Sequence, residues 1–181
     1  MLEIENTALV VIDIQGKLAG MVHDHAKVLK HIQHFIRAAE VFSLPVLLTE
    51  QAPHKIGETV KSIKDLLIPS IKTIHKQSFS CYGSPEFVEY LKKVNRRQIL
   101  VTGIETHVCV YQTARDLHAH GWEVYVIADA VSSRHEFDHR TAIARMRDEG
   151  IIIISMEMAI CELLKTADHP KFKKLIAHIK R

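Results

Sequence analysis

The chain has 181 residues, which is the length of one domain, so we expect a single domain over 1–181. Apolar residues make up 47% and charged residues 25%, ordinary values that exclude a disordered chain or a fibrous repeat. The net charge is +3 with both signs interspersed, so nucleic acid is not an expected partner. No apolar run approaches the ~20 residues of a membrane span, so no membrane association is expected.

Three widely spaced cysteines, Cys81, Cys109 and Cys161, form no CxxC pair. The first five residues include two glutamates and do not have the basic and apolar pattern of a secretory signal. We therefore expect reduced thiols in a cytoplasmic protein. Cys81 and Cys161 are both expected to be packing residues.

The first half of the chain alternates apolar runs with amphipathic stretches. Residues 8–12 predict a strand buried on both faces, and apolar residues at helical spacing follow from Val28 to Phe42. Further strands are predicted over 45–49 and 71–75. Ser84-Pro85 then predicts the start of a helix, because serine caps helices and proline suits the first helical position.

The second half continues the alternation. Strands are predicted over 98–102, 123–127 and 151–154. A helix from about His107 is expected to end at Gly121, and the spacing of Ser133 and Glu136 is typical of a capping box that starts a helix ending at Gly150. A last amphipathic helix opens at Pro170.

Six strands alternating with helices predict an α/β fold, a three-layer α/β/α sandwich with a parallel, six-stranded, Rossmann-like sheet. Ligands bind beyond the carboxyl ends of the strands in such sheets, so functional residues are expected there. The first strand leads into residues 13–17 without a GxGxxG motif, so no dinucleotide cofactor is expected.

Three reactive side chains follow separate strands. Cys109 lies near the start of a helix, where free amides and the helix dipole lower a thiol pKa and could hold an oxyanion. Asp13 and Lys76 end the first and third strands. Asp13 could take the thiol proton while Lys76 orients the pair, which is suited to acyl transfer. The alternative is a buried cysteine, a turn aspartate and a solvated lysine.

This pattern resembles the isochorismatase-like cysteine hydrolase family over nearly the whole chain. The landmarks are residues 8–15, Lys76 with Ser78-Phe79, residues 101–110 and Ser132-Ser133-Arg134. Residues 49–51, 144–147 and 169–172 look most like the subgroup called isochorismatase domain-containing proteins.

The resemblance implies Asp13 as general base, Lys76 as the assisting cation and Cys109 as nucleophile. It also implies a cis peptide between Ile104 and Glu105, with the backbone amides of Glu105 and Cys109 as oxyanion donors. Family members commonly assemble as dimers or larger homo-oligomers, so a homo-oligomer is expected.

Two departures from the family narrow the reaction. Residues 50–54 lack the Asp-x-His metal pair of nicotinamidases, so neither a metal nor nicotinamide is expected. Isochorismate hydrolases lack the nucleophilic cysteine, which is present here as Cys109. The expected reaction is hydrolysis of a C–N bond in a small amide-like substrate through a thioester.

Five further residues are expected to contact the substrate from the loops after the strands. They are Gln15, Gln51, Phe79, Tyr82 and His107. The loops 50–58 and 77–83 are expected to shape the pocket. His31 and His34 are expected on a solvated helix face.

Two other functions stay open. The chain could be a binding or regulatory protein that retains the hydrolase site, because the subgroup has no clear substrate. Separately, His135-Glu136-x-x-His139 matches the zinc-protease pattern, with Glu136 as base. This segment begins a helix and has no third ligand at a familiar spacing, so zinc is not expected.

Overall fold

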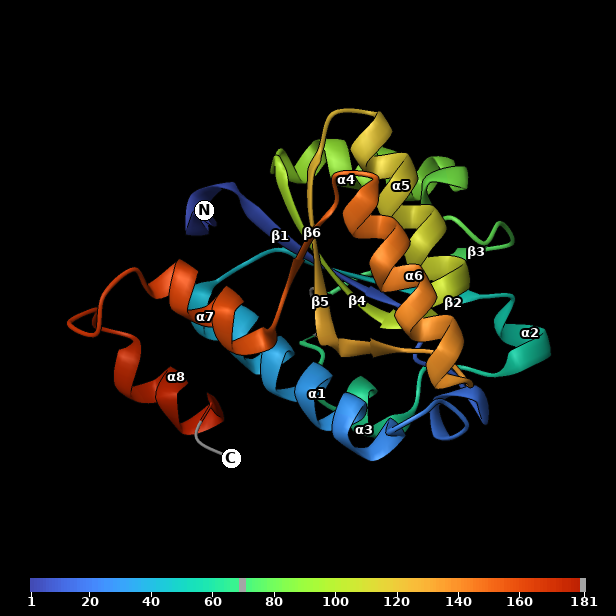
Figure 1. Cartoon of the computed structure of the whole chain (residues 1–181), viewed down its shortest axis with the longest axis horizontal. Helices are drawn as coiled ribbons and strands as arrows, with labels where there is room; N and C mark the ends of the chain where they lie inside the picture. Colours follow the sequence, from blue (N-terminus) through green and yellow to red (C-terminus); the bar gives the residue numbers. More distant parts are fainter. Residues whose placement is uncertain (69–70, 180–181) are drawn as a thin grey trace.

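The computed structural model describes residues 1–68 and 71–179, in which six parallel strands form one sheet in the order β3-β2-β1-β4-β5-β6 (Figure 1). The strands are β1 (Thr7–Ile12), β2 (Val46–Gln51), β3 (Thr73–Lys76), β4 (Gln98–Ile104), β5 (Glu123–Ser132) and β6 (Ile152–Ile154). All six predicted strands and the α/β class are confirmed.

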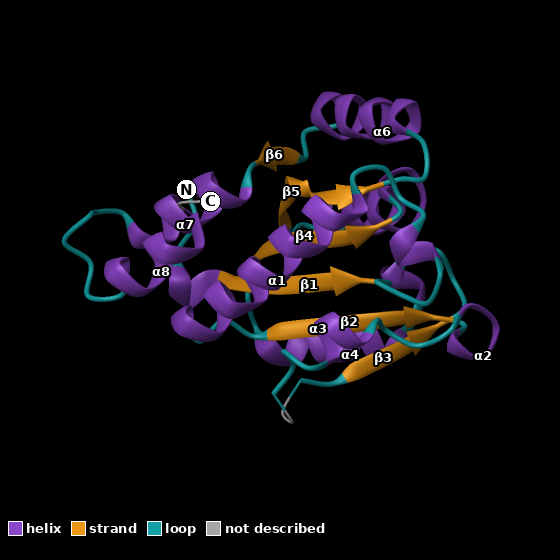
Figure 2. Ribbon diagram, turned by 90° about the horizontal axis from the view of Figure 1, so that it is seen from below, coloured by secondary structure: helices purple, strands orange, loops and turns teal. Residues whose placement is uncertain are grey.

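Helices cover both faces of the sheet (Figures 1 and 2). One face carries α1 (His25–Phe42), α3 (Lys61–Lys64), α7 (Met156–Leu164) and α8 (Phe172–Ile179). The other face carries α4 (Pro85–Val94), α5 (Tyr111–Ala119) and α6 (Glu136–Asp148). A short helix, α2 (Pro53–Ile56), follows β2. Within the described part of the chain, no helix has both the length and the apolar character needed to cross a membrane.

The central strand β1 is covered by helices on both faces, and its side chains contribute to both cores. Leu9 and Val11 belong to the core on the α1 side, and Val10 and Ile12 belong to the core on the α4 and α5 side. Every residue of β1 is buried. A parallel strand covered on both faces needs apolar side chains in both directions, so its sequence shows a continuous apolar run.

Of the two helix starts predicted from capping residues, the start of α4 is confirmed and the cap of α6 is not. At α4, the Ser84 hydroxyl accepts a hydrogen bond from the Phe87 amide and Pro85 is the first helical residue, as predicted. The prediction that Ser133 and Glu136 form a capping box is wrong. The residue that caps α6 is His135, without a side-chain bond, and the Ser133 hydroxyl instead lies 2.9 Å from Nδ1 of His107.

The segment before α5 also differs from the prediction. Residues Thr106–Val110 form one π-helical turn, and the regular helix begins only at Tyr111. This widened turn carries Cys109 on the wall of the cavity described below.

Three side chains lie on the face opposite to the one expected. Cys161 is exposed, because α7 buries Met156, Ala159, Ile160, Leu163 and Leu164 instead. His34 is buried on α1. Nδ1 of His31 lies 2.8 Å from the carbonyl oxygen of Asp129, so His31 is a structural contact and not part of a solvated face.

Gly103 lets β1 and β4 approach closely beside the carboxyl edge of the sheet. Its φ of +129° falls where β4 changes register against β5. A methyl group added there would lie 2.2 Å from the carbonyl oxygen of Ile12, the residue before Asp13. Only glycine avoids both the backbone strain and the clash.

We expect Gly103→Ala to lower the free energy of unfolding by about 3 kcal/mol or more, because it combines overpacking with backbone strain. Chemical denaturation measures this change. Gly20→Ala is the matched control, because a methyl group there has nothing within 4 Å. Equal stability of the two variants would contradict the close approach of β1 and β4.

Candidate active site

A cavity of about 390 Å³ lies at the carboxyl edge of the sheet. The loops after β1, β2, β3 and β4 line it, which is where ligands bind in parallel sheets. Of the residues predicted from the sequence, those lining the cavity are Asp13, Gln51, Phe79, Glu105 and Cys109. The predicted pocket loops 50–58 and 77–83 both contribute to the wall.

A buried ion pair forms the floor of this site. Nζ of Lys76 lies 2.6 Å from Oδ2 of Asp13, and the two side chains are 0% and 2% exposed. The hydroxyl of Thr49 donates to the other carboxylate oxygen of Asp13 at 2.8 Å. Asp13 adopts a φ of +52°, a left-handed conformation that aspartate tolerates better than most residues.

Lys76 uses its remaining hydrogen-bonding capacity within the same site. Its ammonium group donates to Oε1 of Gln51 at 2.8 Å and to the carbonyl oxygens of Ser78 and Phe79 at 3.2 and 3.1 Å. These acceptors stabilise the buried charge. Burial lowers the pKa of Lys76, but the interactions of its ammonium group, with the charge of the Asp13 carboxylate as the largest, together raise this pKa by more, so Lys76 is charged at neutral pH.

The Cys109 thiol is protonated at neutral pH, contrary to the expectation from its place near a helix start. Cys109 is 7% exposed. Burial raises the pKa of its thiol, the Asp13 carboxylate raises this pKa further, and the smaller effect of Lys76 lowers it. Burial and a neighbouring anion outweigh the helix dipole. The site at rest therefore holds a thiol beside a base.

Two residues in this network have roles that the sequence analysis missed. Thr49 donates to Asp13, as described above, and its hydroxyl oxygen lies 3.7 Å from Sγ of buried Cys81. Gln51 accepts from Lys76 and lies 3.7 Å from Sγ of Cys109, so it contacts both the cation and the nucleophile. The signal was their place at the end of β2, between the strands that supply Asp13 and Lys76.

Burial raises the pKa of the Cys81 thiol to about 11. Cys81 is fully buried, which confirms the expectation that it is a packing residue.

Hydrogen bonds to both the backbone and the side chain of Glu105 hold the loop after β4 in place. The peptide between Ile104 and Glu105 is cis, as the family resemblance implied. The carbonyl oxygen of Glu105 accepts from the amides of Val108 and Val110 at 3.1 and 3.2 Å. The Glu105 carboxylate accepts two hydrogen bonds of 3.0 Å from Arg134, one from the backbone amide and one from Nε. Arg134 thus fixes the segment on which the oxyanion donors are predicted.

Gln15 supports the cavity wall from behind. Its side chain is buried, and it exchanges two hydrogen bonds with the backbone of Gln51, at 2.7 and 3.1 Å. It also donates to the carbonyl oxygen of Gly57 at 2.6 Å. It therefore ties the strand end to the loop 50–58 and does not itself line the cavity.

Tyr82 and His107, which were predicted to contact the substrate, do not line this cavity. The ring of Tyr82 stacks on His120 at 4.1 Å between ring centroids. His107 bonds Ser133, and it is two positions before Cys109, a spacing that places the two side chains on different sides of a helical turn.

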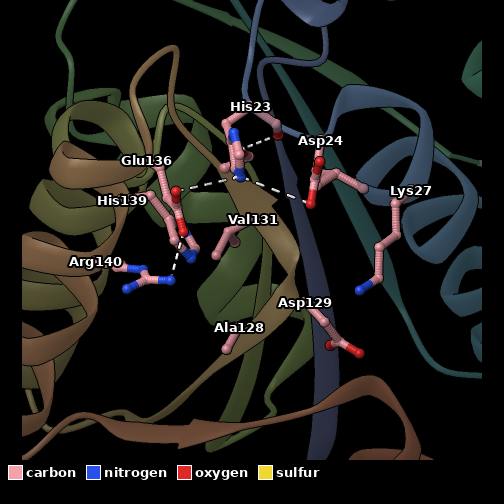
Figure 3. Close-up of a pocket in the computed structure, with 11 residues that line it drawn as sticks. His23, Asp24, Lys27, Ala128, Asp129, Val131, Glu136, His139 and Arg140 are labelled. Carbon is pink, nitrogen blue, oxygen red and sulfur yellow. Dashed lines mark hydrogen bonds and ion pairs between the residues drawn. The ribbon is translucent and has the colours of Figure 1, made fainter.

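Glu136 and His139 of the zinc-protease pattern line a separate cavity, and His135 is not part of its lining (Figure 3). Glu136 pairs with Arg140 at 2.6 Å and lies 3.9 Å from His23. Nδ1 of His139 lies 3.0 Å from the hydroxyl of Thr106, and burial lowers the pKa of His139. Among residues 1–68 and 71–179, no three histidine, cysteine or acidic side chains gather as metal ligands.

Comparison with known proteins identifies the family. The isochorismatase domain model matches residues 7–158. The chain belongs to the isochorismatase family. This membership supports a hydrolase and confirms the resemblance drawn from residues 8–15 and 101–110.

Two relatives and one solved structure show how much of the chain is shared. Isochorismatase domain-containing protein 2 from Xenopus laevis is 35% identical over 171 residues, which cover 94% of this chain and 82% of that protein. The secreted isochorismatase effector Isc1 from Phytophthora sojae is 35% identical over 179 residues, which cover 97% and 85%. The structure of the MAR1 ribonuclease from Caenorhabditis elegans has a TM-score of 0.94 and 35% identity, with 99% and 92% covered.

The charges around Cys109 predict opposite effects of two substitutions. Asp13→Asn removes the anion that raises the pKa of the Cys109 thiol, so the thiolate fraction at neutral pH should rise. Lys76→Met removes the cation that lowers this pKa, so the thiolate fraction should fall. Asparagine also tolerates the left-handed conformation of residue 13.

Site-resolved alkylation by iodoacetamide, read by mass spectrometry, measures these effects. We expect Cys109 of the Asp13→Asn variant to react about tenfold faster than in the unmodified sequence, the change given by one pKa unit. Exposed Cys161 is the internal reference. Slower reaction of Cys109 in Asp13→Asn would show that Asp13 does not act on the thiol as an anion.

Proposed function

We propose that the chain is a cysteine hydrolase that cleaves a C–N bond of a small amide-like substrate. The observation that carries this proposal is the arrangement around Cys109. Its protonated thiol shares a cavity with Asp13, whose carboxylate is held on one oxygen by Thr49 and on the other by Lys76. A protonated nucleophile requires a base, and Asp13 is held where it can serve as one.

In the first half of the reaction, Asp13 accepts the Cys109 proton while Sγ attacks the carbonyl carbon of the substrate. The carbonyl oxygen becomes an oxyanion, which the backbone amides of Glu105 and Cys109 stabilise. The C–N bond then breaks, the leaving nitrogen takes the proton from Asp13, and an amine or ammonia departs. The product bound to the protein is a thioester at Cys109.

In the second half, Asp13 removes a proton from water, which attacks the thioester carbon. The C–S bond breaks, the acid is released, and the proton returns to the sulfur. Lys76 keeps its positive charge throughout and keeps Asp13 in position between the two steps. Asp13, Lys76 and Cys109 thus divide the roles of base, cation and nucleophile.

The cavity wall limits the class of substrate. Its volume of about 390 Å³ is at the lower end of the range for small-molecule sites. Ile56, Phe79 and Val108 provide apolar surface, and Gln51 and Gln77 provide amide groups. These features favour a small amide or ureide with a short apolar part.

A binding or regulatory protein that retains the site is the alternative. The buried Asp13–Lys76 pair argues against it, because keeping two buried charges costs desolvation free energy without a benefit to simple binding. Because the similar structure from Caenorhabditis elegans is that of a MAR1 ribonuclease, RNA is a necessary member of any substrate panel.

We also propose a cytoplasmic homo-oligomer. Exposed apolar side chains support the self-association, with Phe137 on α6 79% exposed and Met158 on α7 50% exposed. Sedimentation velocity measures the assembly. A protein that sediments as a monomer at micromolar concentration would contradict this part of the proposal.

We expect Cys109→Ala to reduce turnover of any accepted amide by at least about a thousandfold, because no other group replaces the nucleophile. The assay is a panel of small amides, ureides and RNA, followed by intact-mass detection of the acyl-enzyme. Cys161→Ser is the matched control, because Cys161 is exposed on α7 and outside the cavity. Its turnover should equal that of the unmodified sequence.

Full turnover by Cys109→Ala would contradict the thioester mechanism. Loss of activity on chelation, together with stoichiometric zinc in the purified protein, would favour the zinc-protease hypothesis. Absence of turnover across the panel would favour the binding protein.

A further inference from the structure

A second large cavity, here called the amino-edge cavity, lies at the end of the sheet opposite to the active site. Thr7 of β1 pairs with Gln98 of β4, and Gln98 pairs with Glu123 of β5, so the loops before these three strands meet. The arrowheads in Figure 2 point away from this edge and toward the catalytic one. The cavity has a volume of about 390 Å³, and its wall includes Asn6, Arg96, Arg97, His120 and Trp122.

Two arginines, Arg96 and Arg97, line the amino-edge cavity, and Lys92 and Lys93 precede them in the sequence outside the lining. Residues 92–97 read Lys-Lys-Val-Asn-Arg-Arg, with four basic residues and no acidic one. Glu123 follows the lining residue Trp122 in the sequence. Its carboxylate accepts hydrogen bonds from Gln98 and Tyr125 at 2.9 and 2.7 Å. Burial raises the pKa of Glu123, but these hydrogen bonds and the charges of the terminal amino group and Arg97 lower it by more, so Glu123 offsets part of the charge of Arg97.

Arg96 lines the amino-edge cavity with a guanidinium that is only weakly paired. Its Nε is buried and has no hydrogen-bond partner within the described ranges. The ion pair recorded for its guanidinium is a 4.0 Å contact with Glu5, whose side chain is 92% exposed. Because Nε is not accessible to solvent, a ligand in the cavity would contact the terminal nitrogens of this side chain, which is 25% exposed. The planar guanidinium is suited to the oxygens of a phosphate group.

Aromatic side chains also line the amino-edge cavity. Trp122 lines it, and so does His120, whose ring stacks on Tyr82 at 4.1 Å. Trp122 lies edge-on to the same Tyr82 ring, with 5.9 Å between centroids. Nδ1 of His120 donates to the carbonyl oxygen of Asp116 at 2.7 Å, which fixes the ring. Fixed aromatic rings beside arginines form a surface on which a planar base can stack.

We propose that the amino-edge cavity binds a small ligand with an aromatic ring and a phosphate group, as a mononucleotide has. Arg96 and Arg97 bind the phosphate, and Trp122 with the His120 ring contacts the base. The volume is within the range of small-molecule sites. Tyr82, which was expected in the substrate pocket, supports this second site instead. The inference is independent of the chemistry proposed for Cys109.

Trp122 provides a direct readout because it is the single tryptophan in the sequence. The experiment is a titration of the full chain with AMP while the tryptophan fluorescence is recorded. We expect a saturable change in fluorescence. Adenosine and inorganic phosphate, which each supply one half of the ligand, should bind at least about tenfold more weakly than AMP, because each loses one set of contacts.

Arginine variants test the phosphate contacts. Arg96→Ala and Arg97→Gln should each raise the Kd for AMP about tenfold or more, the usual effect of losing a hydrogen bond to a charged group. Arg147→Gln, an exposed position on α6 outside the cavity, is the matched control and should leave the Kd unchanged. If Arg96→Ala fails to fold, Arg96→Lys keeps the charge and the aliphatic stem, and Arg97→Gln changes an exposed residue.

Three results would overturn the proposal. One is the absence of a saturable change at millimolar AMP. Another is equal affinity for AMP and inorganic phosphate, which would leave an anion site without a base contact. The third is a combined result, in which AMP binding is lost when Cys109 is alkylated and is retained in both arginine variants. This result would place the nucleotide in the catalytic cavity.

Discussion

The buried ion pair between Asp13 and Lys76 is the constraint on which the active site depends. Two charges that are almost fully excluded from water are tolerated only when each has further partners. Thr49, Gln51 and the carbonyl oxygen of Phe79 supply them. Removing one member of such a pair leaves an unpaired buried charge, at a cost of about 3–5 kcal/mol. The loop after β3 and the end of β2 therefore serve the chemistry by stabilising these charges.

The order of strands explains how these groups meet. β1, β2 and β3 are neighbours, so their carboxyl ends place Asp13, Thr49 and Lys76 side by side. The nucleophile comes from the other half of the sheet, after β4, which is the neighbour of β1 on its other side. The cavity opens where the two halves join. Gly103 permits the close approach of backbones at that junction.

Much of this could be predicted from the sequence because strand order and strand ends leave clear signals. Uninterrupted apolar runs such as 8–12 indicate strands covered on both faces, and the residues after them must share one edge. Asp13, Lys76 and Cys109 were found by that logic. The family resemblance added the cis peptide before Glu105, which spacing alone does not indicate.

The direction of individual side chains could not be predicted in the same way. Tyr82 and His107 follow strand ends, yet their rings contact His120 and Ser133, because local packing decides which way a loop residue points. Ser133 has the right spacing for a helix cap but bonds His107 instead. The protonation of Cys109 also depends on burial and on Asp13, and both are properties of the assembled site.

The protonated state of Cys109 has a consequence for the chemical durability of the protein. Oxidants and electrophiles attack thiolates much faster than thiols, and they attack exposed sulfur faster than enclosed sulfur. Cys109, a residue that is 7% exposed and retains its thiol proton at neutral pH, resists both kinds of damage. In the proposed mechanism, the thiolate is formed only when the carbonyl group of a substrate is in place to receive it. Under this mechanism, the same burial that makes Cys109 need a base also protects its sulfur between turnovers.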